Sequence, residues 1–97
     1  MSLKTDHLDH IELLSQLRYL DILDLSRNEL TSLSSEIRKL TRLTTLNLSH
    51  NQLTNIPSEI CNLTRLTTLN LSYNKLTNLP SEIGKLTNLN GLTGLNI

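Results

Sequence analysis

The chain of 97 residues contains no Val, Ala, Phe or Trp, so its apolar residues are almost all of one kind. Leu is the most frequent residue, and Ile supplies most of the other apolar positions. A globular core normally combines side chains of several shapes to fill space. A core built almost wholly from one residue type therefore indicates a single packing environment that is repeated many times.

Disulfides, membrane spans and net charge are also missing. The single cysteine, Cys61, cannot form an internal disulfide, so nothing points to an oxidising compartment. No apolar run approaches the roughly 18–20 residues of a membrane span, and the polar start at residues 1–9 has no signal-peptide segment. The formal charge is zero, which leaves no global field toward nucleic acid. These absences predict a cytoplasmic protein that binds neither nucleic acid nor a membrane.

The residues that would carry catalysis or hold a metal are sparse. Three glycines, none in a phosphate-loop pattern, exclude a nucleotide cradle. Cys61 has no general base nearby in the sequence, which favours a role as a small filler. His7 and His10 lie near Asp6, but no third ligand is evident, so a solvated helix face is the favoured reading. The sequence predicts no enzyme activity, no cofactor and no metal site.

What the chain does contain is a pattern that recurs at a fixed interval. Segments 20–30, 43–53 and 66–76 all have the spacing L-x-x-L-x-L-x-x-N-x-L. We divide the chain into full repeats at 20–42, 43–65 and 66–88, with a half repeat or cap at 1–19 and a partial repeat at 89–97. Repeats two and three are identical at 17 of 23 positions. Such repetition predicts one solenoid domain at 1–97.

Each part of the repeat predicts a local structure. The Leu-x-Leu pair alternates with polar residues, which is the period of a half-buried strand. The Asn at positions 28, 51 and 74 suits a bend, and its stacked copies predict a buried amide ladder. Pro-Ser-Glu-Ile at 57–60 and 80–83 predicts a corner and then a short helical or 3₁₀ turn. Repeat one has Ser34 in place of the proline, which can alter that one corner.

The two ends of the chain depart from the full pattern. Apolar residues spaced three apart at positions 8, 11, 14 and 17 predict a short helix that begins near His7 and covers the open end of the stack. At the other end, residues 92–97 match 66–71 better when the register slides by three. We therefore predict a lengthened turn at 88–91 and a final strand at 94–97, whose outer edge is unpaired.

These repeats resemble the 23-residue leucine-rich repeat, L-x-x-L-x-L-x-x-N-x-L-x-x-L-P-x-x-I-x-x-L-x-x, over residues 20–88. The resemblance implies an α/β fold, namely a right-handed solenoid with a concave parallel β-sheet, short helical or 3₁₀ turns on the convex side and an N-terminal capping helix. It also implies protein–protein recognition. The pattern is most similar to intracellular and bacterial members, including arrays that flank GTPase domains.

The resemblance places the partner-binding residues on the concave sheet, between and after the strand leucines. They form three columns with one residue per repeat: Ile22, Thr45 and Thr68; Asp24, Asn47 and Asn70; and Arg27, His50 and Tyr73. The last column is the most distinctive, because Arg and Tyr are enriched at binding hot spots. The alternative is that all three columns are simply the solvated surface of the motif.

The sequence therefore predicts a non-enzymatic scaffold that binds a partner protein, of unknown identity, on its concave face. Two alternatives stay open at this point. One is a homo-oligomer that assembles through the open C-terminal strand edge. The other is a regulatory segment of a larger multidomain protein such as a GTPase.

Overall fold

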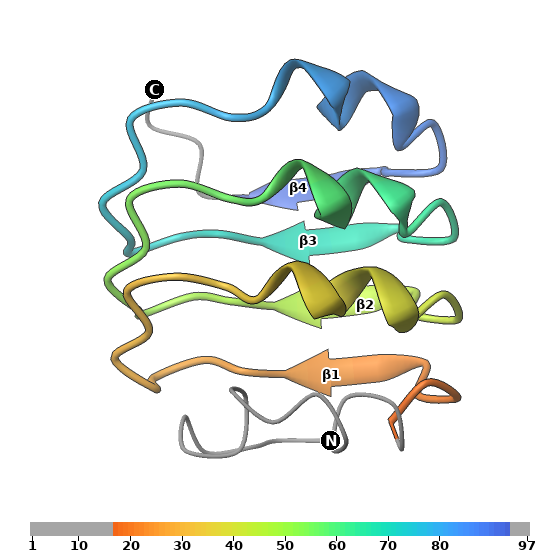
Figure 1. Ribbon diagram of the computed structural model, residues 1–97, viewed down its shortest axis with the longest axis horizontal. Coiled ribbons are helices and arrows are strands. Elements are labelled where there is room, and N and C mark those ends of the chain that lie inside the picture. The colour runs from red at the N-terminus through yellow and green to blue at the C-terminus, as the bar shows by residue number, and fades with distance from the viewer. Residues whose placement is uncertain (1–16, 94–97) are drawn as a thin grey trace.

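A computed structural model describes residues 17–93 as a stack of similar coils (Figure 1). Each coil carries a three-residue strand on one side and a five-residue 3₁₀ turn on the other. In chain order the elements are β1 (Ile22–Asp24), η2 (Ser35–Lys39), β2 (Thr45–Asn47), η3 (Ser58–Asn62), β3 (Thr68–Asn70), η4 (Ser81–Lys85) and β4 (Gly91–Thr93). The predicted solenoid with a parallel sheet and 3₁₀ turns is confirmed, while the capping helix falls in residues 1–16, outside the described part of the chain.

The four strands form one parallel sheet in the order β1-β2-β3-β4. Their register advances by one repeat at each step, so that Ile22 pairs with Thr45, Thr45 with Thr68 and Thr68 with Gly91. Backbone hydrogen bonds continue the ladder past the strand ends, as between Leu25 N–H and Asn47 C=O at 2.8 Å. Each strand is therefore held mainly by its neighbours in the stack.

The predicted position of the last strand is wrong. β4 occupies 91–93 and keeps the strict 23-residue register with β3, and the turn before it has the same length as in the earlier repeats. The Asn90 N–H donates to the Thr67 C=O at 3.0 Å, which continues the bond from Thr67 N–H to Thr44 C=O at 2.8 Å. Pairing with β3 thus determines the register, although Gly94 then stands where earlier repeats have a leucine. Residues 94–97 lie outside the described range.

The corner before each 3₁₀ turn has the same backbone whether or not proline is present. Ser34 has φ −63° and ψ 140°, close to the −66° and 144° of Pro57 and the −60° and 143° of Pro80. The Ser34 hydroxyl oxygen also accepts the Glu36 N–H at 3.1 Å, a cap that the two prolines do not provide. The substitution of proline by serine therefore leaves this corner unaltered.

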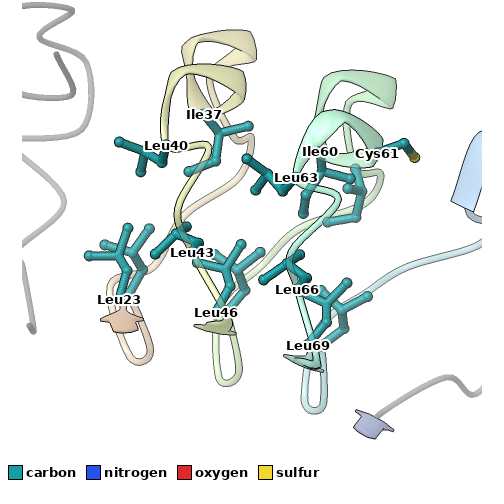
Figure 2. Packing of buried hydrophobic residues seen from close by; sticks show 14 of the residues in the cluster. Leu23, Ile37, Leu40, Leu43, Leu46, Ile60, Cys61, Leu63, Leu66 and Leu69 are labelled. Carbon is teal, nitrogen blue, oxygen red and sulfur yellow. The ribbon is translucent and has the colours of Figure 1, made fainter. Parts of the chain in front are cut away.

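Leucines and isoleucines from the strands and the 3₁₀ turns fill the space between them. Figure 2 shows Leu23, Leu46 and Leu69 lying side by side in successive coils, facing Ile37 and Ile60 from the opposite layer. All five are at most 1% exposed. Their constant spacing along the sequence is what places like side chains on top of one another, so the single packing environment inferred from the composition is confirmed.

The predicted asparagine ladder is present and works through the backbone. The Asn51 Oδ1 accepts the N–H groups of Asn28 and Leu30, each at 3.0 Å, from the preceding coil. Its Nδ2 donates to Leu48 C=O at 2.9 Å and to Leu25 C=O at 3.1 Å. One buried amide thus satisfies polar backbone groups of two coils, which would otherwise lie unpaired in an apolar core.

The repeat register extends back to the first described residues. Leu20 N–H donates to Leu17 C=O at 2.9 Å, as Leu43 N–H does to Leu40 C=O at 3.2 Å one repeat later. Leu17 is buried against the core. Leu17 is therefore the counterpart of Leu40, and the loop that carries it leads directly into β1.

Candidate functional site

The open face of the sheet carries two of the three predicted columns. The parallel register stacks Ile22, Thr45 and Thr68 in one row, and Asp24, Asn47 and Asn70 in another. The strand residues between them, such as Leu46, point into the core. Ile22 is 56% exposed, and the remaining five are half-buried. The structure therefore brings each column together on one nearly uncharged surface, in which Asp24 is the one ionisable side chain.

The Asp and Asn side chains of the second column are engaged by the turn that follows each strand. The Asp24 Oδ1 accepts the Ser26 hydroxyl at 2.6 Å and the Ser26 N–H at 2.9 Å. The same pair of bonds joins Asn47 to Ser49 and Asn70 to Ser72. These oxygens stabilise the turn and are not the only polar atoms of the column, which also carries the second carboxylate oxygen of Asp24 and the Nδ2 groups of Asn47 and Asn70.

These hydrogen bonds also affect the charge of Asp24. The pKa of the Asp24 carboxyl lies below its usual value, mainly because the Ser26 hydroxyl donates to it and secondly because the Ser26 N–H does. Hydrogen bonds to the ionised form favour that form. Asp24 is therefore a fixed negative charge at the first coil, where the later coils present neutral amides.

The third predicted column lies where the chain turns away from the sheet. Arg27, His50 and Tyr73 have φ values of 60°, 57° and 57°, all in the left-handed region. Residues other than Gly, Asn and Asp rarely adopt this conformation, because the side chain approaches the backbone too closely. The following Asn of each coil ties the turn down, so the surrounding structure holds the unfavourable backbone in place. Strained residues of this kind concentrate at functional sites.

Two members of this column form a preassembled aromatic pair. The rings of His50 and Tyr73 are stacked, with centroids 4.3 Å apart and planes inclined by 12°. Tyr73 is 73% exposed and His50 is half-buried, while Arg27 is exposed one coil earlier. The structure therefore stacks His50 and Tyr73 into one surface feature, beside the end of the sheet at which the strands finish.

Tyr19 is a further exposed aromatic residue that the sequence pattern did not indicate as part of a site. Tyr19 is 64% exposed and lies in the loop before β1, at the opposite end of the strands. The guanidinium carbon of Arg18 lies 5.0 Å from its ring centroid, and that of Arg42 lies 5.8 Å away. The signal that would have revealed this contact is the 23-residue spacing between Tyr19 and Arg42, which stacks the two in adjacent coils.

The described residues offer little for catalysis or metal binding. Cys61 is only 2% exposed, and burial is the main cause that raises the pKa of its thiol, which disfavours the reactive thiolate. Residues 17–90 contain no group of three His, Cys, Asp or Glu side chains that could hold a metal ion. His7 and His10 lie outside the described range. Within that range, no helical element has the length and apolar character needed to cross a membrane.

Comparison with known proteins assigns the chain to a family. A family model described as a leucine-rich repeat region matches residues 1–97. The chain belongs to the leucine-rich repeat family. Leucine-rich repeat proteins are typically scaffolds without enzymatic activity, and their fold suits a protein-interaction module. No curated protein matches this leucine-rich repeat chain closely enough to add a more specific role.

Solved structures support the same assignment. The chain is similar to a leucine-rich repeat protein of Leptospira interrogans, with 35% identity and a TM-score of 0.76 over 98% of this chain. It is also similar to a structure described as a TDR receptor, with 34% identity and a TM-score of 0.75 over 87% of this chain. The match spans 30% of the first protein and 15% of the second.

Proposed function

We propose that this leucine-rich repeat chain is a non-enzymatic module that binds a partner protein on its concave sheet, with Arg27, His50 and Tyr73 as the anchoring residues. The observation that carries the proposal is the stacked pair of His50 and Tyr73 at 4.3 Å on left-handed backbone. A binding partner meets rings that are already ordered, so less conformational entropy is lost on association.

The sheet beside these anchors supports the same role. Its rows of Thr and Asn are uncharged and half-buried, and the Nδ2 groups of Asn47 and Asn70 are donors for a partner's carbonyl groups. Ile22, at 56% exposure, adds an apolar contact at the first coil. An interface with aromatic and Arg anchors next to small polar contacts is the composition expected at a protein–protein site.

The test replaces the three anchors together by asparagine, as Arg27→Asn, His50→Asn and Tyr73→Asn. Asparagine tolerates left-handed backbone, so the variant removes the side chains without adding strain to the turn. Tagged wild-type and variant proteins are used to capture partners from cell lysate, and the captured proteins are quantified by mass spectrometry. Proteins bound by the wild type are expected to fall to background with the triple variant.

The matched control carries Arg38→Gln and Lys85→Gln on the convex 3₁₀ turns η2 and η4, far from the anchors. It is expected to capture the same proteins as the wild type. Equal capture by the anchor variant and the wild type contradicts the assignment to the concave face. A thermal melt of all three proteins shows whether the fold is retained.

We propose self-assembly as a second candidate, because the last described coil is less well covered than the one before it. Leu76, Leu79, Ile83 and Leu89 are only partly buried. Their counterparts Leu53, Ile56, Ile60 and Leu66 are at most 5% exposed. Within residues 17–93, β4 is also the outer strand of the sheet. A second copy stacked on this end would bury both features.

Sedimentation velocity over a range of protein concentrations tests this candidate. Assembly predicts a mass that rises with concentration, and Leu79→Lys is expected to return the protein to the monomer. Ser81→Lys, on an exposed residue of η4, is the control and should assemble like the wild type. A monomer mass that does not change with concentration contradicts this candidate.

We further propose a cytoplasmic location. The support is the single thiol of Cys61, which is buried and free, so that the fold gains nothing from an oxidising compartment. Fractionation of the source cells with an antibody to the chain tests the location, and recovery in a secreted or membrane fraction contradicts it.

A further inference from the structure

A second surface lies at the opposite end of the strands from the proposed anchors. It is formed by the loops that precede the strands, on the right of the sheet in Figure 1, where the strand arrows begin. Positions 19, 42 and 65 of these loops follow one another at the repeat spacing and carry Tyr19, Arg42 and Arg65, and Arg18 adjoins the first of them. All four residues are exposed. We call these four residues the arginine ridge.

The arginine ridge has a defined geometry around Tyr19. The guanidinium carbons of Arg18 and Arg42 lie 5.0 Å and 5.8 Å from the centroid of its ring. Both distances are within the roughly 6 Å range of a cation–π contact. Such a contact uses the face of the guanidinium plane, and the N–H donors at its edge can still bind an acceptor. The ring therefore holds two of the three arginines near one another without neutralising them.

Among residues 17–93, the arginine ridge takes part in neither of the two ion pairs. In the part of the chain that the structure describes, both ion pairs involve Glu36, which contacts Arg38 and Lys39 on the convex turn η2. Arg18, Arg42 and Arg65 have no carboxylate within ion-pair distance there. Asp21 is the one acidic residue of these loops, and Thr44 and Thr67 replace it in the next two coils. In these described loops, three exposed arginines thus stand beside a single carboxylate.

We propose that the arginine ridge binds an extended, acidic segment of a partner protein that runs across the repeats. Equivalent residues of adjacent coils are about 4.8 Å apart, the spacing of paired strands. Alternate side chains of an extended peptide are roughly 7 Å apart, a difference that the flexible Arg side chains can span. Acidic residues at alternate positions therefore match Arg42 and Arg65 and can form bidentate contacts with both. Tyr19 supplies the adjoining aromatic contact.

Nucleic acid is a poorer fit to the same surface. The whole chain has no net charge, and the ridge contains one exposed aromatic side chain rather than a row of them. Binding of single-stranded nucleic acid requires both a longer positive groove and successive aromatic platforms. A protein segment needs only the short positive ridge, and its carboxylates can form bidentate contacts with the guanidinium groups.

The experiment measures the fluorescence anisotropy of a labelled peptide of about twelve residues with Glu at alternate positions, the spacing of one side of an extended chain. It is mixed with the full 97-residue chain. The variant pair Arg42→Gln and Arg65→Gln is expected to raise the Kd at least tenfold. The control pair Arg38→Gln and Lys85→Gln removes the same charge from the convex turns and is expected to change the Kd less than twofold. A peptide with Gln in place of Glu should not bind.

Three outcomes overturn the proposal. They are absence of binding by the Glu peptide, an equal loss of binding in both variant pairs, and tighter binding of a thymidine oligonucleotide of matched charge. The triple asparagine variant of the concave anchors separates this proposal from the proposed function, because it should bind the Glu peptide like the wild type. If it loses the peptide, the acidic segment binds the concave anchors and the assignment to the ridge fails, whatever becomes of the proposed partner.

Discussion

Leu53 and Leu76 occupy the same position in consecutive repeats, but Leu53 is completely buried and Leu76 only partly so. The two repeats are identical at 17 of 23 positions, so the sequence of each repeat does not explain the difference. Among the described elements, repeat two lies between repeats one and three, whereas only β4 follows repeat three. In a stack, the burial of a residue is determined by its neighbours as much as by its own identity.

The largest expected effect comes from truncating these two leucines. Leu53→Ala should lower the free energy of unfolding by about 2–5 kcal/mol, since it leaves a cavity in a well-packed site. Leu76→Ala should cost clearly less, because part of its surface is already in contact with water. Urea denaturation of both variants gives the comparison, and equal losses would show that the two coils are covered alike.

The asparagine ladder provides the next comparison. Asn51→Ala should cost about 1–3 kcal/mol, because it leaves buried backbone groups of two coils without partners. Asn74 makes similar bonds, among them the acceptance of Leu53 N–H at 3.0 Å, but its side chain is half-buried and water can replace it. Asn74→Ala is therefore expected to be milder. A larger loss for Asn74→Ala in thermal melts would contradict this account.

Repeat one carries the ionisable Asp24 where repeat two carries the neutral Asn47, and this difference predicts a pH effect. The pKa of Asp24 is lowered in the folded protein, so its ionised form adds stability above the unfolded value of about 3.9. That contribution is lost as the pH falls through the lower, folded pKa. Asp24→Asn, which copies Asn47, should abolish this part of the acid dependence. Urea midpoints measured from neutral pH to about pH 2, below the unfolded pKa, check it; identical pH profiles would refute it.

The smallest effect is expected at the corner before each 3₁₀ turn. Pro57→Ser should cost less than about 1 kcal/mol, the usual entropic benefit of a compatible proline, because Ser34 already adopts the same backbone angles. The new serine also regains a cap like that of Ser34 on Glu36 N–H. Ser34→Ala loses that cap and should cost at least as much. Denaturation midpoints of the two variants decide the order.

The interior of the fold could be predicted from the sequence because the same pattern of apolar and Asn positions recurs in every repeat. Leu23, Leu46 and Leu69 each mark a strand, and the Asn after them marks the bend, so an error in one copy is corrected by the others. The last strand had no such support. Leu95 and Ile97 fit the local motif after a shift of three residues, but backbone pairing of β4 with β3 outweighs that fit.

The candidate site was predictable by position and not by conformation. The third column was found because the family resemblance indicates the position after each strand, and Arg27 and Tyr73 are of types enriched at binding hot spots. The left-handed backbone of Arg27, His50 and Tyr73 could not be predicted from the sequence, since none of the three is a residue type that usually adopts this conformation. The contact of Arg42 with Tyr19 joins adjacent coils, so it follows from their 23-residue spacing once the repeats are stacked.

At the left-handed positions 27, 50 and 73, the identity of the side chain, among unbranched residues, has little effect on the stability of the fold. At such a position no ordinary residue is favoured by the backbone, so Arg, His and Tyr pay a similar conformational penalty. Exchange among unbranched side chains there is nearly neutral for folding, while Val, Ile and Thr are excluded because branching at Cβ makes the conformation much worse. A library that varies positions 27, 50 and 73 over the unbranched residues would therefore sample new specificities on an unchanged scaffold.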